Sequence, residues 1–148
     1  MKKQATVGLW MYQNGGGDVI EQRLKSDLSA LGIETISGLN LAHACSKMGQ
    51  TTCHGTIMEH LDLFFSYNAG EQTPYQVHLY EALGKAIPTI NSFDAFKITE
   101  DKFFTSTILA RNGLPTSDFR LIHRDDVAGL KKTVKDWNGQ VVYKPVEG

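Results

Sequence analysis

The sequence has no long apolar run, no marked excess of charge of either sign and very little cysteine. It lacks any apolar stretch of about eighteen residues, and no basic start is followed by an apolar stretch and a cleavage site, so membrane spanning and secretion are both disfavoured. Fifteen basic residues stand against sixteen acidic ones, which gives no basic stripe for a nucleic-acid partner. Cys45 and Cys53 match neither a CxxC redox motif nor a zinc pair. We therefore expect a cytoplasmic protein with reduced thiols, and no nucleic-acid or membrane partner.

What is present is an alternation of apolar strands and helices over residues 1–91. Apolar, β-prone stretches predict buried strands at 5–12, 33–37, 62–66 and 87–91. Helices are predicted at 18–31 and 74–85, the second opened by a capping box with Thr73 as the N-cap. Residues 38–58 show no period and are expected to form short strands or a hairpin. Strands that alternate with single helices pair in parallel, so we expect a three-layer α/β domain over residues 1–91.

The remaining third of the chain predicts a linking helical segment and the start of a second domain. The segment 92–115 is helical as far as Gly113, where the glycine and a proline beyond it end the helix. The part 116–148 is expected to contain, in order, a strand at 119–123, a helix at 124–137 and a strand at 141–146. Two strands and one helix do not make a core of their own, so this part predicts a truncated domain.

Polar residues follow two of the predicted strands in the first domain. The glycine loop "NGGGD", Asn14 to Asp18, precedes a helix, and Asn68 follows the strand at 62–66. One interpretation of the glycine loop is a flexible turn with Asp18 as the N-cap. The other is a substrate-facing loop formed by Asn14, Gly15 and Gly16, since open α/β sheets bind ligands at the carboxyl ends of their strands.

Two lysines carry the second group of candidates. Lys102 lies in the first turn of a predicted helix, where a cation opposes the helix dipole at a cost of roughly 0.3–1 kcal/mol. It is either part of a solvated helix start or, with the helix N-terminus, a site for a phosphate. Lys144 interrupts an apolar stretch and precedes Pro145, so it either points to solvent or reaches a bound anion.

Read together, these motifs resemble a known family. "DK" opening a helix, then "LP", a strand, a helix, "NG" and a strand carrying "KP" and a glycine resemble the start of an ATP-grasp domain. The α/β unit before it, which ends in "PTINSFDAF", resembles the Rossmann-like pre-ATP-grasp domain of these enzymes. The chain is most similar to the RimK-type glutamate ligases and their glutathione-synthetase-like relatives. The resemblance covers nearly the whole chain and rests on the order and spacing of the motifs.

The resemblance implies a carboxylate–amine ligase that forms an amide bond through an acyl phosphate, with ATP and Mg²⁺ as cofactors and a glutamate or amino-acid substrate. It assigns Lys102 and Lys144 to the phosphates of ATP and makes Gly148 the start of a mobile phosphate loop. The family's magnesium ligands lie further along, so we expect the chain to be an N-terminal fragment that is inactive by itself. The alternatives are a non-catalytic α/β binding module and a relative of the D-alanine–D-alanine ligases.

Two further predictions concern the histidines and the segment after Gly113. The five histidines show no metal-ligand spacing, so we predict ordinary polar side chains and no metal site among them. The predicted strands after Gly113 leave an unpaired sheet edge, and such edges recruit other chains. We therefore expect that segment to be poorly ordered or held by a second copy, which makes a homo-oligomer the predicted assembly.

Overall fold

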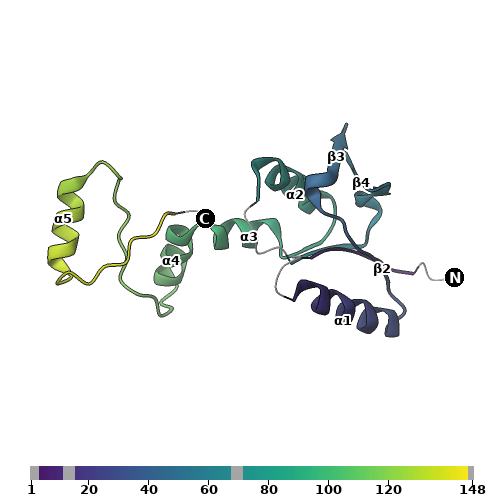
Figure 1. Cartoon of the computed structure of the whole chain (residues 1–148), viewed down its shortest axis with the longest axis horizontal. Coiled ribbons are helices and arrows are strands. Elements are labelled where there is room, and N and C mark those ends of the chain that lie inside the picture. The colour runs from purple at the N-terminus through teal and green to yellow at the C-terminus, as the bar shows by residue number, and fades with distance from the viewer. Residues whose placement is uncertain (1–3, 12–15, 68–71, 147–148) are drawn as a thin grey trace. The chain divides into compact units, whose positions relative to one another are not determined.

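The computed structural model describes residues 4–11, 16–67 and 72–146 (Figure 1). The chain divides into two compact units, Met1–Ala95 and Phe96–Gly148. In the described part of the chain, no helix is both long enough and apolar enough to cross a membrane.

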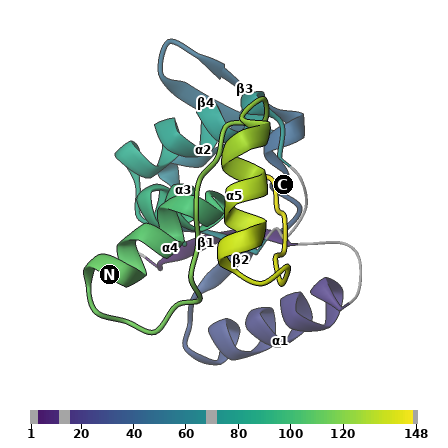
Figure 2. The same ribbon diagram turned by 90° about the vertical axis from the view of Figure 1, so that its left-hand side faces the viewer.

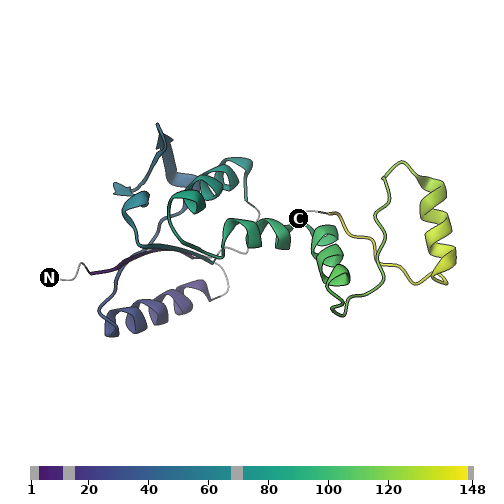
Figure 3. The ribbon, with the colours of Figure 1, turned by 180° about the vertical axis from the view of Figure 1, so that it is seen from behind.

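The first unit is built on a four-stranded sheet in which every pairing is parallel. In spatial order its strands are β2 (Glu34–Ile36), β1 (Thr6–Met11), β6 (Leu63–Tyr67) and β7 (Thr89–Ile90). The helices α1 (Gly17–Ala30) and α2 (Pro74–Ala86) lie on opposite faces of this sheet (Figures 1 and 3). The α/β architecture with a parallel sheet is confirmed, and it is compatible with a Rossmann-like domain.

The central strand β1 is buried on both faces, as strands between two layers are. One face carries Val7, Leu9 and Met11, which pack against Leu24 and Leu28 of α1. On the other face Gly8 leaves space that the side chains of neighbouring elements fill, and a β-carbon there would lie only 2.5 Å from a methyl carbon of Leu61. Alternate residues of β1 thus pack into the hydrophobic layers on the two faces of the sheet.

The segment between β2 and β6 forms a second, antiparallel sheet, which confirms the hairpin expected within 38–58. Its strands are β3 (Ala44–Lys47), β4 (Gln50–Cys53) and β5 (Thr56–Ile57). Two-residue turns join them, and both central residues of each turn have positive φ: 51° and 83° at Met48 and Gly49, 45° and 82° at His54 and Gly55. Positive φ at both positions gives the twist that tight hairpins need. Figure 2 shows the β3–β4 hairpin and α1 on different sides of the parallel sheet.

The helix ends follow local side-chain chemistry. The predicted capping box is present: the Thr73 hydroxyl accepts from the backbone N–H of Gln76, and the Gln76 side chain accepts from the Thr73 N–H. Gly32, with φ of 73°, follows α1 as predicted.

The helix predicted across the segment 92–115 is wrong as a single element. It is broken into α3 (Phe93–Glu100) and α4 (Lys102–Arg111). The break occurs at Asp101, whose backbone is extended and whose Oδ1 accepts from the Phe104 N–H at 2.7 Å. An aspartate that satisfies the first turn of a new helix also ends the preceding one.

The second unit contains no strand among its described residues, so the strands predicted at 119–123 and 141–146 are wrong. One helix, α5 (Val127–Asp136), follows the first of these segments; it begins where Asp126 caps it through the Gly129 N–H. Two β-prone segments without a third strand have little to gain by pairing. Side-chain contacts hold the first segment instead: the rings of Phe103 and Phe119 lie 5.9 Å apart edge to face, and Arg120 contacts α5.

Candidate functional site

The first candidate site lies at the start of α4, in the second unit. Asp101 is the N-cap of this helix, and Lys102 is its first residue. The Lys102 side chain is half-buried, and its backbone carbonyl accepts from the Ser106 hydroxyl at 2.9 Å. The position of Lys102 in a first helical turn was predicted from the sequence and is confirmed.

The segment that carries Lys144 returns to the same place. The backbone N–H of Lys102 donates to the carbonyl oxygen of Val146 at 3.0 Å. Figures 1 and 3 show the last described residues, in yellow, running back toward the beginning of α4. Lys102 and Lys144 are 42 positions apart in the sequence. The hydrogen bond joins Lys102 directly to Val146, which is only two residues beyond Lys144.

The two lysine side chains near the start of α4 are suited to binding an anion such as a phosphate. Lys144 is exposed, so its long side chain has room to turn toward a ligand. Two ammonium groups on neighbouring segments would stabilise the charge of a phosphate, as lysines in phosphoryl-transfer sites do. The Asp101 carboxylate accepts from the Phe104 N–H, and its negative charge lies beside Lys102.

The N-terminus of α4 contributes less to the predicted phosphate site than the sequence suggested. The first-turn N–H groups of a helix are available to an anion only while they have no other acceptor. Here the N–H of Lys102 donates to Val146, and the N–H of Phe104 donates to the Asp101 carboxylate. A phosphate at this place would therefore depend on the lysine side chains more than on the helix terminus.

A second candidate site was expected at the carboxyl edge of the parallel sheet. β1 leads into α1 on one face and β6 leads into α2 on the other, so the topological switch point of the sheet lies between these two strands. The residues that follow them include the expected substrate-facing Asn14, Gly15 and Asn68. These three residues, and Gly148, lie outside the residues that the structure describes.

Gly16 is the one member of that predicted set that the structure places. It is the N-cap of α1, with φ of 112°, and makes no side-chain cap. The alternative in which Asp18 caps this helix is wrong, because the helix begins at Gly17 and Asp18 lies in its first turn, where a carboxylate favours the helix dipole. Only glycine adopts such a φ without strain, so the backbone conformation alone accounts for a glycine at position 16, whether or not the loop binds a ligand.

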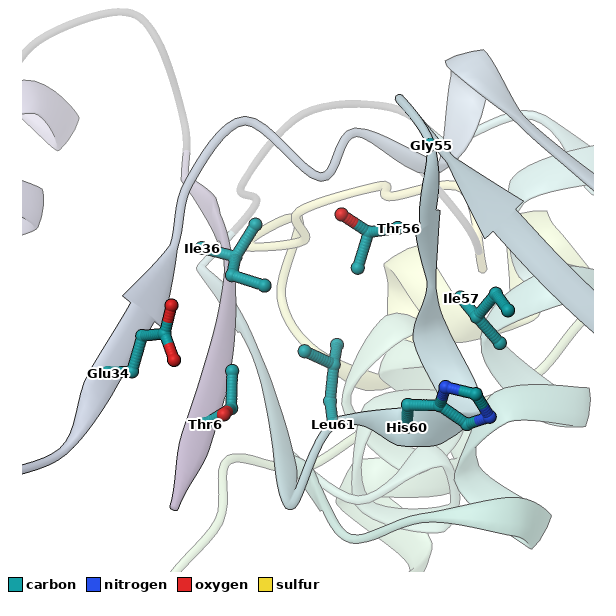
Figure 4. A pocket seen from close by; sticks show the side chains of 8 residues that line it. All are labelled: Thr6, Glu34, Ile36, Gly55, Thr56, Ile57, His60 and Leu61. Atoms are coloured by element: carbon teal, nitrogen blue, oxygen red, sulfur yellow. The ribbon is translucent and has the colours of Figure 1, made fainter. Parts of the chain in front are cut away.

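A cavity of about 350 Å³ lies elsewhere in the first unit, between an edge of each sheet. Figure 4 shows the Ile36 and Leu61 side chains facing this space from two segments and the Ile57 side chain on the other side of its strand, with Glu34 and His60 on opposite sides of the opening. The cavity lies near the amino ends of β1 and β2, at the opposite end of these strands from the switch point. Sequence reasoning missed it, because nothing local indicates that β5 runs beside β2.

The Arg120 side chain lies at the centre of a polar cluster in the second unit. It donates to Asp136 at 2.9 Å and to Thr133 at 3.2 Å, and its guanidinium lies 5.1 Å from the centre of the Trp137 ring. Lys132 donates to the same Asp136 oxygen at 2.7 Å. The hydrogen bonds from Lys132 and Arg120 lower the pKa of Asp136 below its ordinary value. The cluster explains how the Arg120 segment is held without a strand.

Among the described residues, no group of three or more histidine, cysteine or acidic side chains could hold a metal ion. The described residues therefore do not by themselves supply a magnesium site of the kind that the resemblance implies.

Burial raises the pKa of the Cys53 thiol, which keeps it protonated and unreactive at neutral pH.

Comparison of the chain with protein-family models, with curated proteins and with solved structures finds no match.

Proposed function

We propose that this chain is the N-terminal part of an ATP-dependent carboxylate–amine ligase of the ATP-grasp type. Its first unit would be the pre-ATP-grasp domain, and its second unit the beginning of the nucleotide-binding domain. ATP would supply the phosphoryl group that activates a substrate carboxylate before an amine displaces phosphate and forms an amide bond. The substrate class is an amino acid or a peptide, and Mg²⁺ would be bound by residues outside this chain.

The observation that carries the proposal is the hydrogen bond from the Lys102 N–H to the Val146 carbonyl. The resemblance assigns Lys102 and Lys144 to one nucleotide, which requires that distant segments lie together. The 3.0 Å bond meets this requirement for the backbone. In this role Lys102, half-buried at the helix start, provides a charge in a fixed position, while the exposed Lys144 closes over the phosphates.

A non-catalytic binding module is the second candidate, and the cavity between β2 and β5 favours it. At about 350 Å³, this open depression reaches the lower end of the sizes that small ligands use. Its lining combines the apolar Ile36, Ile57 and Leu61 with the polar Thr6, Glu34, Thr56 and His60. Such a module would bind a ligand in the first unit and would need neither lysine.

The test uses the product of the complete reading frame. Lys102→Ala and Lys144→Ala should each weaken ATP binding by about 10- to 150-fold, because removing a charged partner of a phosphate costs roughly 1.5–3 kcal/mol. Lys131→Ala is the matched control, since Lys131 is an exposed lysine on α5 in the same unit. Titration calorimetry with ATP gives the affinities.

A second measurement separates the two candidates. A ligase of this kind forms one ADP with each acyl phosphate, and only the amine discharges the acyl phosphate and allows another cycle. Continuous ADP release therefore requires both a carboxylate and an amine, and it is followed with mixtures of amino acids. If both lysine variants bind ATP as tightly as the parent protein, the phosphate role is wrong. If the parent protein binds no ATP and no mixture yields ADP, the binding module is favoured over the ligase.

A further inference from the structure

The antiparallel sheet brings together two histidines that the sequence keeps eleven positions apart. β3 and β4 pair so that Ala44 lies opposite Cys53. His43 precedes the first of these residues and His54 follows the second, so both histidines flank the last pair of the ladder. Their ring centroids lie 5.5 Å apart, with an angle of 71° between the ring planes, and both side chains are exposed.

The backbone on both sides of this histidine pair is held firmly. His43 ends a 3₁₀ turn, in which its N–H donates to the Asn40 carbonyl at 2.9 Å and the Asn40 side chain accepts from the Ala42 N–H at 2.8 Å. His54 has φ of 45° in the tight turn between β4 and β5. The Cys53 thiol donates to the Asn40 carbonyl at 3.4 Å and so links the two segments. The backbone positions of the two histidines are therefore fixed by these contacts, and only the side chains need to turn.

The spacing of the rings fits chelation of one metal ion. With a Zn–N distance of about 2.0–2.1 Å, the metal lies about 3.2 Å from the centre of each imidazole ring. Two ring centres 5.5 Å apart then subtend roughly 120° at the metal, which is close to the tetrahedral angle that Zn²⁺ prefers. Because the side chains are exposed, rotation about their side-chain bonds can turn a nitrogen of each ring toward the ion.

We propose that His43 and His54 form a two-histidine binding site for a borderline divalent transition metal ion such as Zn²⁺, Cu²⁺ or Ni²⁺. Imidazole is a ligand that all three ions accept readily. Cys53 does not complete the site, since its side chain is buried and its sulfur faces the Asn40 carbonyl. With two protein ligands, the remaining coordination positions are open to water or to an anionic ligand. This distinguishes the site from a closed structural zinc site.

The test titrates the chain with Zn²⁺ and follows the imidazole resonances by NMR. The resonances of His43 and His54 should shift together and saturate at one equivalent of zinc. Removing either ligand turns a chelate into a single contact, so His43→Gln and His54→Asn should each weaken zinc binding by about 100-fold. Asparagine is chosen at position 54 because it tolerates positive φ, which preserves the turn.

The control is His78→Gln, which removes an exposed histidine from α2. This variant should bind zinc as the parent chain does. Far-UV circular dichroism of each variant verifies that the fold is kept. The proposal is overturned if His43 and His54 shift with different midpoints, if the His78 variant loses as much affinity as the other two, or if the parent chain shows no zinc-dependent shift at either histidine.

Discussion

Adding a single methyl group at Gly8 should destabilise the first unit. Gly8 is in the middle of β1 and pairs with Ile36 on one side and Phe64 on the other. A β-carbon at this position would lie 2.5 Å from Cδ1 of Leu61, 2.8 Å from Cδ1 of Leu39 and 3.3 Å from Cδ2 of Phe64. These three side chains are at most 4% exposed, so none can move aside into solvent.

The magnitude follows from opposing contributions. Optimal contacts between carbon atoms are about 3.5–4.0 Å, so the two shortest distances fall short by roughly 1 Å. Overpacking of this kind costs about 1–3 kcal/mol. Replacing glycine with alanine also restricts the unfolded chain, which offsets about 0.4–1 kcal/mol. A net loss of about 1 kcal/mol would lower the midpoint of thermal unfolding by about 4–8 °C for a domain of this size.

The assay is urea unfolding of Gly8→Ala followed by the fluorescence of Trp10, which is buried in the same strand. Gly84→Ala provides the control. Gly84 lies inside α2, and a β-carbon there would be 3.4 Å or more from its neighbours, an ordinary contact. Alanine in a helix interior should therefore stabilise by about 0.5–1 kcal/mol. Equal stabilisation by the two substitutions would refute the packing argument at Gly8.

Two further predictions concern the second unit. The pKa of Asp136 is lowered in the folded state, so its stabilising contribution is complete above its ordinary value of 3.8 and is lost as the pH falls through the lowered value. Asp136→Asn should therefore reduce the loss of unfolding free energy between pH 5 and pH 3, measured by urea unfolding with Trp137 fluorescence. An equally large loss in the variant and the parent chain would contradict this reasoning. The amide of Gln140 donates to the Trp137 carbonyl, whereas among the described residues the amides of 141–143 have no backbone acceptor. We expect hydrogen exchange to be slower at Gln140 than at 141–143 in dilute solution, and strong protection of 141–143 in a monomeric sample would contradict the structure.

Features decided by neighbouring residues could be predicted from the sequence. The Thr73–Gln76 capping box, the stop after α1 and the alternation of strands and helices depend on interactions within a few residues, and all three are present. The break at Asp101 is equally local, since an aspartate before a helical stretch is a favoured N-cap. The prediction that Lys102 lies in a first helical turn implied this helix start, whereas the single helix predicted over the segment did not. The parallel sheet followed because its connections are short and allow few topologies.

Features decided by distant partners could not be predicted in this way. The stretch 141–146 has β-prone residues, yet Val142 and Tyr143 are about 80% exposed, because a strand also needs a neighbour. The approach of His43 to His54 depends on the register of β3 and β4, which no spacing in the sequence reveals. The contact between Lys102 and Val146 was not predicted, since neither segment contains a signal for the other. The resemblance implied only that Lys102 and Lys144 serve one nucleotide.

The link between α4 and the Val146 carbonyl has a consequence for how position 102 can vary. The donor is a peptide N–H, so any residue except proline can keep the terminal segment in place, and the charge of Lys102 is a separate property. Proline is favoured at the first position of a helix, and Asp101 already has an extended backbone, with φ of −91° and ψ of 104°. Alanine at 102 would thus remove the charge and keep the link, whereas proline would remove both and leave the helix intact. Anchoring of the chain and attraction of an anion are separable at a single residue.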